Sequence, residues 1–311
     1  MVSLSPTRAP SRDAPSPPPR ARREVSTLRR GHRRLAMIYA TPLAVIVAVL
    51  FVVPLGLMVW MSFNHWPLLG ASAPNGVANY RALSDPLFLH ALWFTVKYTV
   101  VTTVVLGLVA FGLALLVQEG PRGVGLFRTV FFLPSAVGLA SASLLFYGMF
   151  NTHSSVLNAA MRLLAGGDVD WLGSSGNALF STIGMITWRF AGFYMLILMT
   201  GLHAIDPVLY EAARTDGAGW WQIMRRVTVP LLRPTIALMM VLSVTGSLLA
   251  FDQFFILTGG RHGTATIVID VYREAFLSQD LGRAAAVSVA ILVGLILING
   301  AQLRLLRRDG R

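Results

Sequence analysis

The chain has 311 residues, of which 55% are hydrophobic and 13% are charged, against roughly 25% charged for an ordinary soluble domain. A net charge of +12 would suit a nucleic-acid-binding protein, but the arginines gather at the two ends and in two loops instead of along one face. The absence of cysteine excludes disulfides, thiolate nucleophiles and cysteine-ligated metal centres. We therefore expect a protein of the lipid bilayer with no nucleic-acid partner.

The amino-terminal segment, residues 1–34, is rich in Pro, Ser and Arg and has almost no large apolar side chains. It cannot bury enough surface to offset the entropy lost on ordering, so we predict a disordered cytoplasmic tail. The alternative is a cleaved signal peptide, because Ala71-Ser72-Ala73 has the character of a cleavage site. The apolar run of residues 35–63 is far longer than the roughly 7–15 residues of a signal-peptide core, which favours an uncleaved membrane helix.

Six apolar stretches are long enough to cross the roughly 30 Å of bilayer hydrocarbon as helices. They lie near residues 35–62, 92–118, 127–150, 178–203, 235–257 and 284–303. Pro134 and Gly138 interrupt the third stretch, which membrane helices tolerate when neighbours satisfy the freed carbonyl. The sequence thus predicts an all-α integral membrane bundle of six transmembrane helices, residues 35–303, followed by a short cytoplasmic tail, residues 304–311.

Arginines distinguish the two sides of this predicted bundle. Nineteen lie in the amino-terminal tail, in the connections after the second and fourth spans, and at the carboxyl end, whereas five lie on the opposite side. Cytoplasmic loops are enriched in arginine and lysine, so we expect both termini in the cytoplasm of a bacterial cell.

The connection after the fourth span, residues 204–234, is long for a small bundle and contains its own helix signals. Asp206 is a suitable N-cap, Pro207 suits the first helical position, and Gly217 suits the left-handed residue that ends a helix. These signals predict a helix of two to three turns over residues 208–216.

The second half of this connection, residues 219–229, combines apolar and basic side chains. Its Trp220 and Trp221 precede Arg225 and Arg226, a composition typical of an amphipathic helix at a membrane surface. Pro230 is expected to end this helix just before the fifth span.

The same connection resembles a known motif. Glu211-Ala212-Ala213, three residues, Gly217, nine residues and then Val227-Thr228-Val229-Pro230 match the pattern E-A-A, three residues, G, nine residues, I-x-L-P, with Val in place of Ile and Leu. This is the EAA loop of the permease subunits of ATP-binding-cassette (ABC) importers. The match identifies the chain as similar to that family.

Further elements resemble the carbohydrate-type permeases of maltose and glycerol-phosphate importers, over about residues 35–303. They are Pro54, Ser62-Phe63, Asn79-Tyr80, Asp85-Pro86, Phe88, Arg128, Pro134, Phe251-Asp252 and Leu257-Thr258-Gly259-Gly260. The Phe-Asp and Leu-Thr elements fit the first of the two permeases in such systems better than the second. At Arg261-His262 the sequence departs from the family, which usually continues with Gly-Pro, so the resemblance does not predict the conformation of that periplasmic loop.

The resemblance implies that the EAA loop docks in a cleft of a cytoplasmic ATPase and transmits its closure to the membrane helices. The residues expected to couple are Glu211, Ala212, Ala213, Asp216, Gly217 and Pro230. The two alanines permit close approach of a partner, and the glycine permits a turn with positive φ. The alternative for Glu211 is an ion pair with Arg214 on the same helix.

The chain has no signature of catalysis. A phosphate-binding loop requires a lysine, and the one lysine, Lys97, lies within the second predicted span. Neither an H-E-x-x-H metal motif nor a G-x-S-x-G nucleophile motif is present in the sequence. We expect a non-catalytic subunit with no catalytic residue, metal site or cofactor of its own, ATP and Mg being bound by a partner ATPase.

Ionisable residues inside membrane helices indicate a transport pathway or a buried pair. We predict a candidate translocation pathway in which aromatic rings stack on a sugar and polar groups bind its hydroxyls, formed by Trp188, Arg189, Phe193, Tyr194, Asp252 and Gln253. The structural alternatives are that Arg189 pairs with Asp252 or caps neighbouring carbonyls, that Asp252 serves gating, and that Lys97 extends to the periplasmic interface.

The resemblance implies a carbohydrate importer permease in the bacterial inner membrane. Its partners would be a second permease, two ATP-binding cassette ATPase subunits and an extracytoplasmic solute-binding protein. A glycerol-phosphate ester is the alternative solute. An ion-coupled secondary carrier is the less favoured class, because we find no internal repeat between the two halves of the sequence.

Overall fold

The computed structural model describes residues 39–118, 124–150 and 156–308, which divide into two units between Leu57 and Met58. The predicted disordered tail, residues 1–34, lies outside the described residues. The first unit contributes most of a helix, Tyr39–Ser62, which contains the π-helical turn η1 (Ala48–Val52) and continues as α2 (Val53–Ser62). Its apolar length confirms the first predicted membrane helix.

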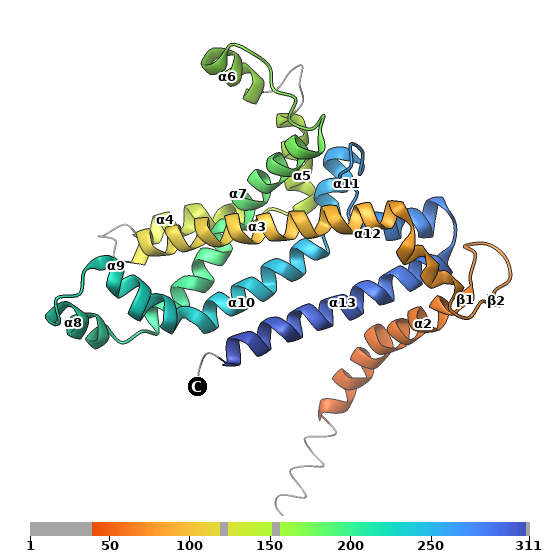
Figure 1. Cartoon of the computed structure of the whole chain (residues 1–311), viewed down its shortest axis with the longest axis horizontal. Coiled ribbons are helices and arrows are strands. Elements are labelled where there is room, and N and C mark those ends of the chain that lie inside the picture. The colour runs from red at the N-terminus through yellow and green to blue at the C-terminus, as the bar shows by residue number, and fades with distance from the viewer. Residues whose placement is uncertain (1–38, 119–123, 151–155, 309–311) are drawn as a thin grey trace, which may run out of the picture. The chain divides into compact units, whose positions relative to one another are not determined.

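The second unit begins with the last residues of α2, and a short antiparallel hairpin follows, β1 (Asn64–His65) and β2 (Ala73–Pro74), in which Asn64 pairs with Pro74. Helices follow for the rest of the described chain (Figure 1). In chain order they are η2 (Ala78–Ser84), α3 (Pro86–Gln118), α4 (Val124–Phe132), η3 (Leu133–Ala136), α5 (Leu139–Met149), α6 (Val156–Ala165), α7 (Ser175–His203), α8 (Pro207–Thr215), α9 (Trp220–Ile223), η4 (Met224–Thr228), α10 (Val229–Leu248), α11 (Asp252–Thr258), α12 (Ile267–Tyr272), η5 (Arg273–Leu277) and α13 (Leu281–Arg308).

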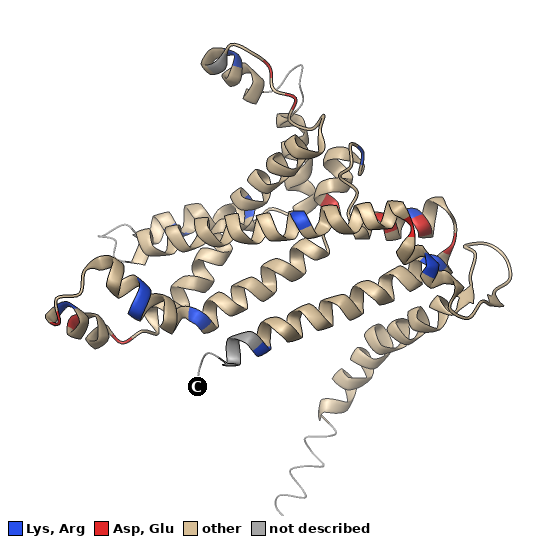
Figure 2. Ribbon diagram, viewed as in Figure 1, with Lys and Arg blue, Asp and Glu red and all other residues tan. Residues whose placement is uncertain are grey.

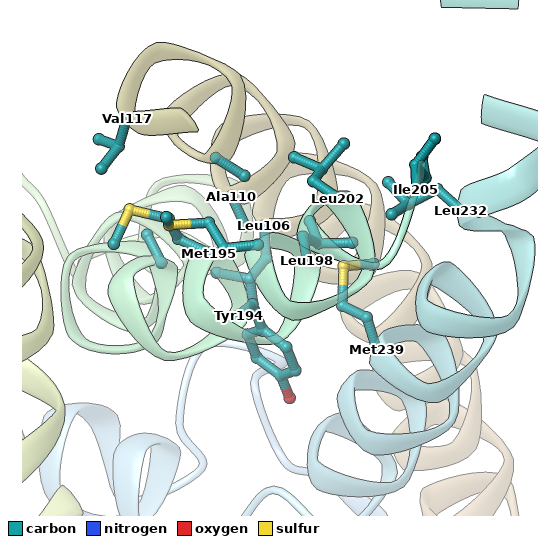
Figure 3. Close-up of a cluster of buried hydrophobic side chains, with 13 residues drawn as sticks. Leu106, Ala110, Val117, Tyr194, Met195, Leu198, Leu202, Ile205, Leu232 and Met239 are labelled. Atoms are coloured by element: carbon teal, nitrogen blue, oxygen red, sulfur yellow. The ribbon is translucent and has the colours of Figure 1, made fainter. Parts of the chain in front are cut away.

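The core of the second unit lies where α3, α7 and α10 pack against one another. Apolar side chains from all three helices interlock there, as Figure 3 shows. The cluster contains Leu106, Ala110, Ala114 and Val117 of α3, Tyr194, Met195, Leu198 and Leu202 of α7, and Leu232 and Met239 of α10. Alanines on α3 bring its backbone close to α7, which is how membrane helices gain packing in the absence of a hydrophobic drive between them.

Charged residues gather at the two ends of these helices and are sparse along their lengths (Figure 2). Five described helices are long and apolar enough to cross a membrane, and a bent pair makes a sixth. This agrees with the all-α, six-span bundle predicted from the sequence. The last helix, α13, extends from Leu281 to Arg308, so residues 304–308 continue the helix instead of forming a separate tail.

The third predicted span is not one straight helix. α4 with η3 and then α5 meet at a bend of 92°. Pro134 has no N–H to donate, and the backbone turns extended at Val137, just before Gly138 caps α5. The break frees the Val137 carbonyl, which accepts a hydrogen bond from Arg189 Nε of α7 at 2.8 Å.

The fifth predicted span, residues 235–257, is wrong at both ends. Its helix runs unbroken from Trp220 to Leu248, through α9, η4 and α10. The predicted stop at Pro230 is therefore also wrong: that proline sits directly after the wide π-helical turn η4, within the first turn of α10. The helix instead ends before Ala250, whose freed carbonyl accepts a 2.6 Å hydrogen bond from Thr266 Oγ1, and α11 begins separately.

Candidate functional site: the loop helix and the broken spans

The helix α8 begins where the sequence predicts. Asp206 has an extended backbone, and its Oδ1 accepts a hydrogen bond from Val208 N at 3.0 Å. Pro207 occupies the first turn, where its missing N–H leaves no hydrogen bond unmade. Together these residues set the start of the helix by local chemistry alone.

The end of α8 also follows the prediction. Gly217 has φ +74°, a left-handed conformation that a residue with a side chain rarely adopts. Its N–H donates to the Arg214 carbonyl, and Ala218 N–H donates to the Ala213 carbonyl, each at 3.0 Å. This pair of hydrogen bonds is a Schellman motif, which closes the helix and turns the chain sharply back toward α9.

The body of α8 presents its side chains outward. No residue of this helix is buried, and Glu211 and Ala212 are exposed. Within the described residues, Glu211 and Arg214 form no ion pair, so the structure does not contain the local pairing that was the alternative for Glu211. The exposed face is therefore free to meet another molecule.

Tyr210 anchors α8 to the membrane helices, a role that the sequence did not predict. Its ring packs against the core between α3, α7 and α10, and its hydroxyl accepts a 3.3 Å hydrogen bond from Thr228 Oγ1 at the start of α10. An aromatic residue directly before the Glu-Ala-Ala triplet was the available signal. A cavity of about 550 Å³ separates the rest of α8 from the bundle, and Tyr210, Glu211 and Trp220 are among its lining residues.

Pro230 stands apart from the other residues predicted to couple. It lies within the continuous helix that runs into α10, whereas Glu211 to Gly217 form α8 and its closing turn. In Figure 1, α8 and α9 lie at the end of the bundle where α3 ends and α13 approaches its carboxyl terminus. The loop and the carboxyl terminus therefore share one side.

The predicted pathway residues of α7 face different surroundings. Arg189 donates to the Val137 carbonyl, and its guanidinium carbon lies 4.2 Å from the centre of the Phe190 ring. The sequence left two structural alternatives for Arg189, an ion pair with Asp252 or a hydrogen bond to a backbone carbonyl. The structure shows the hydrogen bond to the carbonyl. Among the described side chains, Arg189 and Asp252 form no ion pair. Trp188 contacts Phe146 of α5.

The next two aromatic residues of α7 differ in burial: Phe193 lies at the surface and Tyr194 in the core. Phe193 is partly exposed, and its ring contacts Tyr194 edge-on at 5.3 Å between centres. Tyr194 is a buried member of the cluster formed with α3 and α10, and in Figure 3 its hydroxyl extends away from the other labelled side chains. Of the four predicted pathway residues of α7, Trp188, Arg189 and Phe193 thus keep exposed surface.

Asp252 and Gln253 begin α11, so they do not belong to the fifth long helix as predicted. Gln253 is buried, and its Nε2 donates to the Tyr98 hydroxyl of α3 at 3.3 Å, while its Oε1 has no hydrogen-bond partner among the described residues. Asp252 is half-buried. The structure therefore uses Gln253 to join α11 to α3 and does not gather all six predicted pathway residues into one cluster.

Comparison with known proteins identifies relatives over most of the chain. The family model described as binding-protein-dependent transport system inner membrane component matches residues 104–309. The trehalose/maltose transport system permease protein of Thermococcus litoralis is 29% identical over 271 residues, 86% of this chain and 92% of the relative. The sn-glycerol-3-phosphate transport system permease protein of Salmonella choleraesuis is 30% identical over 281 residues, 88% of this chain and 94% of the relative.

A solved structure shares the fold. A chain from the crystal structure of a bacterial ABC transporter involved in the import of the acidic polysaccharide alginate superimposes with a TM-score of 0.79 and 21% identity. The match covers 92% of this chain and all of the other.

Proposed function

The chain belongs to the family of binding-protein-dependent transport system inner membrane components, and on that premise we propose that it is the pore-forming permease subunit of an ATP-driven importer for a sugar or sugar-like solute. Membership makes it a transport component and a multi-pass protein of the inner membrane. The proposal adds the solute class, the partners and the coupling element.

The observation that carries this proposal is the geometry of α8. An exposed helix of nine residues is fixed at both ends by local hydrogen bonds and stands off the bundle over a cavity. Such a helix has little to bury within its own chain. We propose that its Glu-Ala-Ala face docks on a cytoplasmic ATPase subunit.

Movement of α8 has a direct route into the membrane. Tyr210 joins it to Thr228, and Thr228 lies within the single helix that runs from Trp220 to Leu248. That helix packs on α3 and α7 in the core. A displacement of α8 by a closing ATPase would therefore reach α10 through the contact between Tyr210 and Thr228.

The remaining partners follow from the same mechanism. Alternating access needs two bundles that move against each other, so we propose a second permease and two ATPase subunits, with an extracytoplasmic binding protein delivering the solute. We propose that the arginine-rich side, which carries α8, faces the cytoplasm, because cytoplasmic loops are enriched in arginine.

For the solute, two candidates have support. A relative named for trehalose and maltose transport, and the exposed rings of Trp188 and Phe193 beside Arg189, favour a sugar. A relative named for sn-glycerol-3-phosphate transport, with the guanidinium of Arg189, favours a phosphate ester as the second candidate. Uptake of trehalose compared with uptake of sn-glycerol 3-phosphate distinguishes them.

The test of coupling is ATP hydrolysis by the assembled transporter in lipid, with the loaded binding protein added. We expect Glu211→Ala combined with Gly217→Val to reduce the stimulated rate about tenfold, the size of a typical coupling between sites, while the chain still reaches the membrane. Glu211→Ala alone removes the charge without straining the turn, and keeps the test valid if the double variant folds poorly.

A matched control lies on the other side of the bundle. Gly166 has the same φ of +74° as Gly217, and Asp168 is an exposed acid two residues later. Asp168→Ala combined with Gly166→Val should leave stimulated hydrolysis close to that of the unmodified chain. If the Glu211 and Gly217 variant instead keeps fully stimulated ATP hydrolysis, α8 is not the coupling element, and an ion-coupled carrier becomes the favoured function.

A further inference from the structure

A basic and aromatic face lies at the start of the helix Trp220–Leu248. Trp220 and Trp221 are both about two-thirds exposed, at 66% and 67%, with ring centres 6.0 Å apart. Arg225 and Arg226, one turn further along, are exposed as well. We call Trp221, Arg225 and Arg226, with the adjacent Trp220, the Trp-Arg face.

Buried side chains in the same turns show which part of this segment faces the bundle. Met224 and Thr228 are buried against the bundle, and Thr228 is joined to Tyr210 of α8. Trp220 lines the cavity beneath α8 together with Met224 and Thr228, whereas Trp221, Arg225 and Arg226 are exposed and lie outside that lining. Further along the same helix, α10 carries exposed apolar side chains that include Leu231, Leu238 and Leu242.

Helix length places the Trp-Arg face at the level of lipid headgroups. The helix has 29 residues, and at 1.5 Å per residue it is about 43 Å long, compared with roughly 30 Å of bilayer hydrocarbon. The excess of about 13 Å corresponds to the first two to three turns, which contain both tryptophans and both arginines. Tryptophan is enriched at this depth because its ring is apolar and its N–H is polar.

The charges of these two exposed arginines are available to a partner outside the chain. Among the acidic side chains that the structure describes, none pairs with Arg225 or Arg226. Two adjacent guanidinium groups beside indole rings, at the boundary of an apolar helix surface, complement a phosphate group attached to acyl chains. We propose that the Trp-Arg face is a binding site for the headgroup of an anionic phospholipid in the leaflet on the side of α8.

Such a site would affect the coupling of α8 to ATP hydrolysis as well as the depth of this helix in the membrane. The bound lipid would hold the first turns of this helix at a fixed depth, and those turns support α8 through Thr228 and Tyr210. ATP hydrolysis by the assembled transporter should therefore depend on anionic lipid. This inference goes beyond the proposed function and does not depend on which solute is carried.

The test uses the assembled transporter in nanodiscs of phosphatidylcholine with or without phosphatidylglycerol. Native mass spectrometry should show retained phosphatidylglycerol, and Arg225→Gln with Arg226→Gln should weaken its retention about 30-fold, the effect expected of two basic side chains at a membrane surface. Brominated phosphatidylglycerol should quench tryptophan fluorescence more than brominated phosphatidylcholine. Trp220→Phe with Trp221→Phe should remove most of that difference.

The matched control is Arg162→Gln with Arg261→Gln, two exposed arginines outside this helix. It should leave lipid retention unchanged. Equal retention of both lipids by the unmodified transporter would overturn the proposal. So would loss of the ATPase subunits from the Arg225 and Arg226 variant in both lipid compositions, because the face would then be a protein contact. Failure of the Glu211 test alone leaves the lipid measurement unaffected.

Discussion

Asp270 of α12 lies among charged side chains at the opposite end of the bundle from α8. Arg283 of α13 binds Glu274 at 3.2 Å and Asp85 at 3.7 Å, and so joins three segments that are distant in the sequence. Burial raises the pKa of Asp270 above its usual value, and the nearby Glu274 raises it further, although Arg273 acts in the opposite direction. The folded protein thus holds a proton on Asp270 more tightly than the unfolded chain does.

The raised pKa of Asp270 makes the folded protein less stable as the pH rises. The contribution of Asp270 to stability is fully present below the pKa of an unfolded aspartate and is lost as the pH rises through the higher folded pKa. Asp270→Asn should remove this slope and raise the melting temperature more at pH 8 than at pH 4. The effect should stay below about 1 kcal/mol, because the carboxyl is only half-buried.

Thermal unfolding of the purified protein in detergent, followed across this pH range, makes the measurement. Asp168→Asn, at an exposed acid, provides the control and should show no comparable difference. An identical pH dependence in the Asp270 variant and the unmodified chain would contradict this account.

At the scale of elements, the position of the broken third span depends on a close approach to α7. Gly192 of α7 faces the backbone carbonyl of Phe131 at the end of α4, and a Cβ at position 192 would collide with that carbonyl. Because both groups in this contact belong to the backbone, no flexible side chain can move to relieve the collision. The bend near Val137 and the glycine of α7 are therefore parts of one packing arrangement.

Gly192→Val should push α4 away from α7 and lower the free energy of unfolding by about 1–3 kcal/mol, the usual range for an overpacked site. Gly184, two turns earlier on the same helix, has open space around its Cα, so Gly184→Ala is the matched control. It should leave stability unchanged or raise it by up to about 1 kcal/mol, because alanine favours helix over glycine. Thermal melting in detergent compares the two, and equal stability would contradict the packing argument.

At the scale of the whole molecule, the side of the membrane that α8 occupies determines the mechanism. Alkaline phosphatase fused after Gly70 or after Gly167 should be active, because both positions lie in connections that the arginine distribution places outside the cytoplasm. Green fluorescent protein fused at the carboxyl end should fluoresce, since that end shares the side of α8. The reverse pattern of the two reporters would exclude docking of α8 on a cytoplasmic ATPase.

The sequence by itself determined those features that depend on neighbouring residues. The apolar lengths of the spans follow from composition, and both ends of α8 follow from Asp206, Pro207 and Gly217, whose caps need only atoms within a few residues. The helix of the EAA loop is predictable from the sequence for the same reason.

Tertiary structure alone decided which prolines interrupt a helix and which polar groups meet. The third span breaks after Pro134, where Arg189 of α7 satisfies the freed Val137 carbonyl, whereas Pro230 is accommodated within a continuous helix. Arg189 is bound to Val137 and Gln253 to Tyr98, so the predicted pathway residues do not bind one another in a single cluster. A backbone group inside a membrane must find its hydrogen-bond partner within the protein, and that partner lies on another helix whose position the local sequence does not contain.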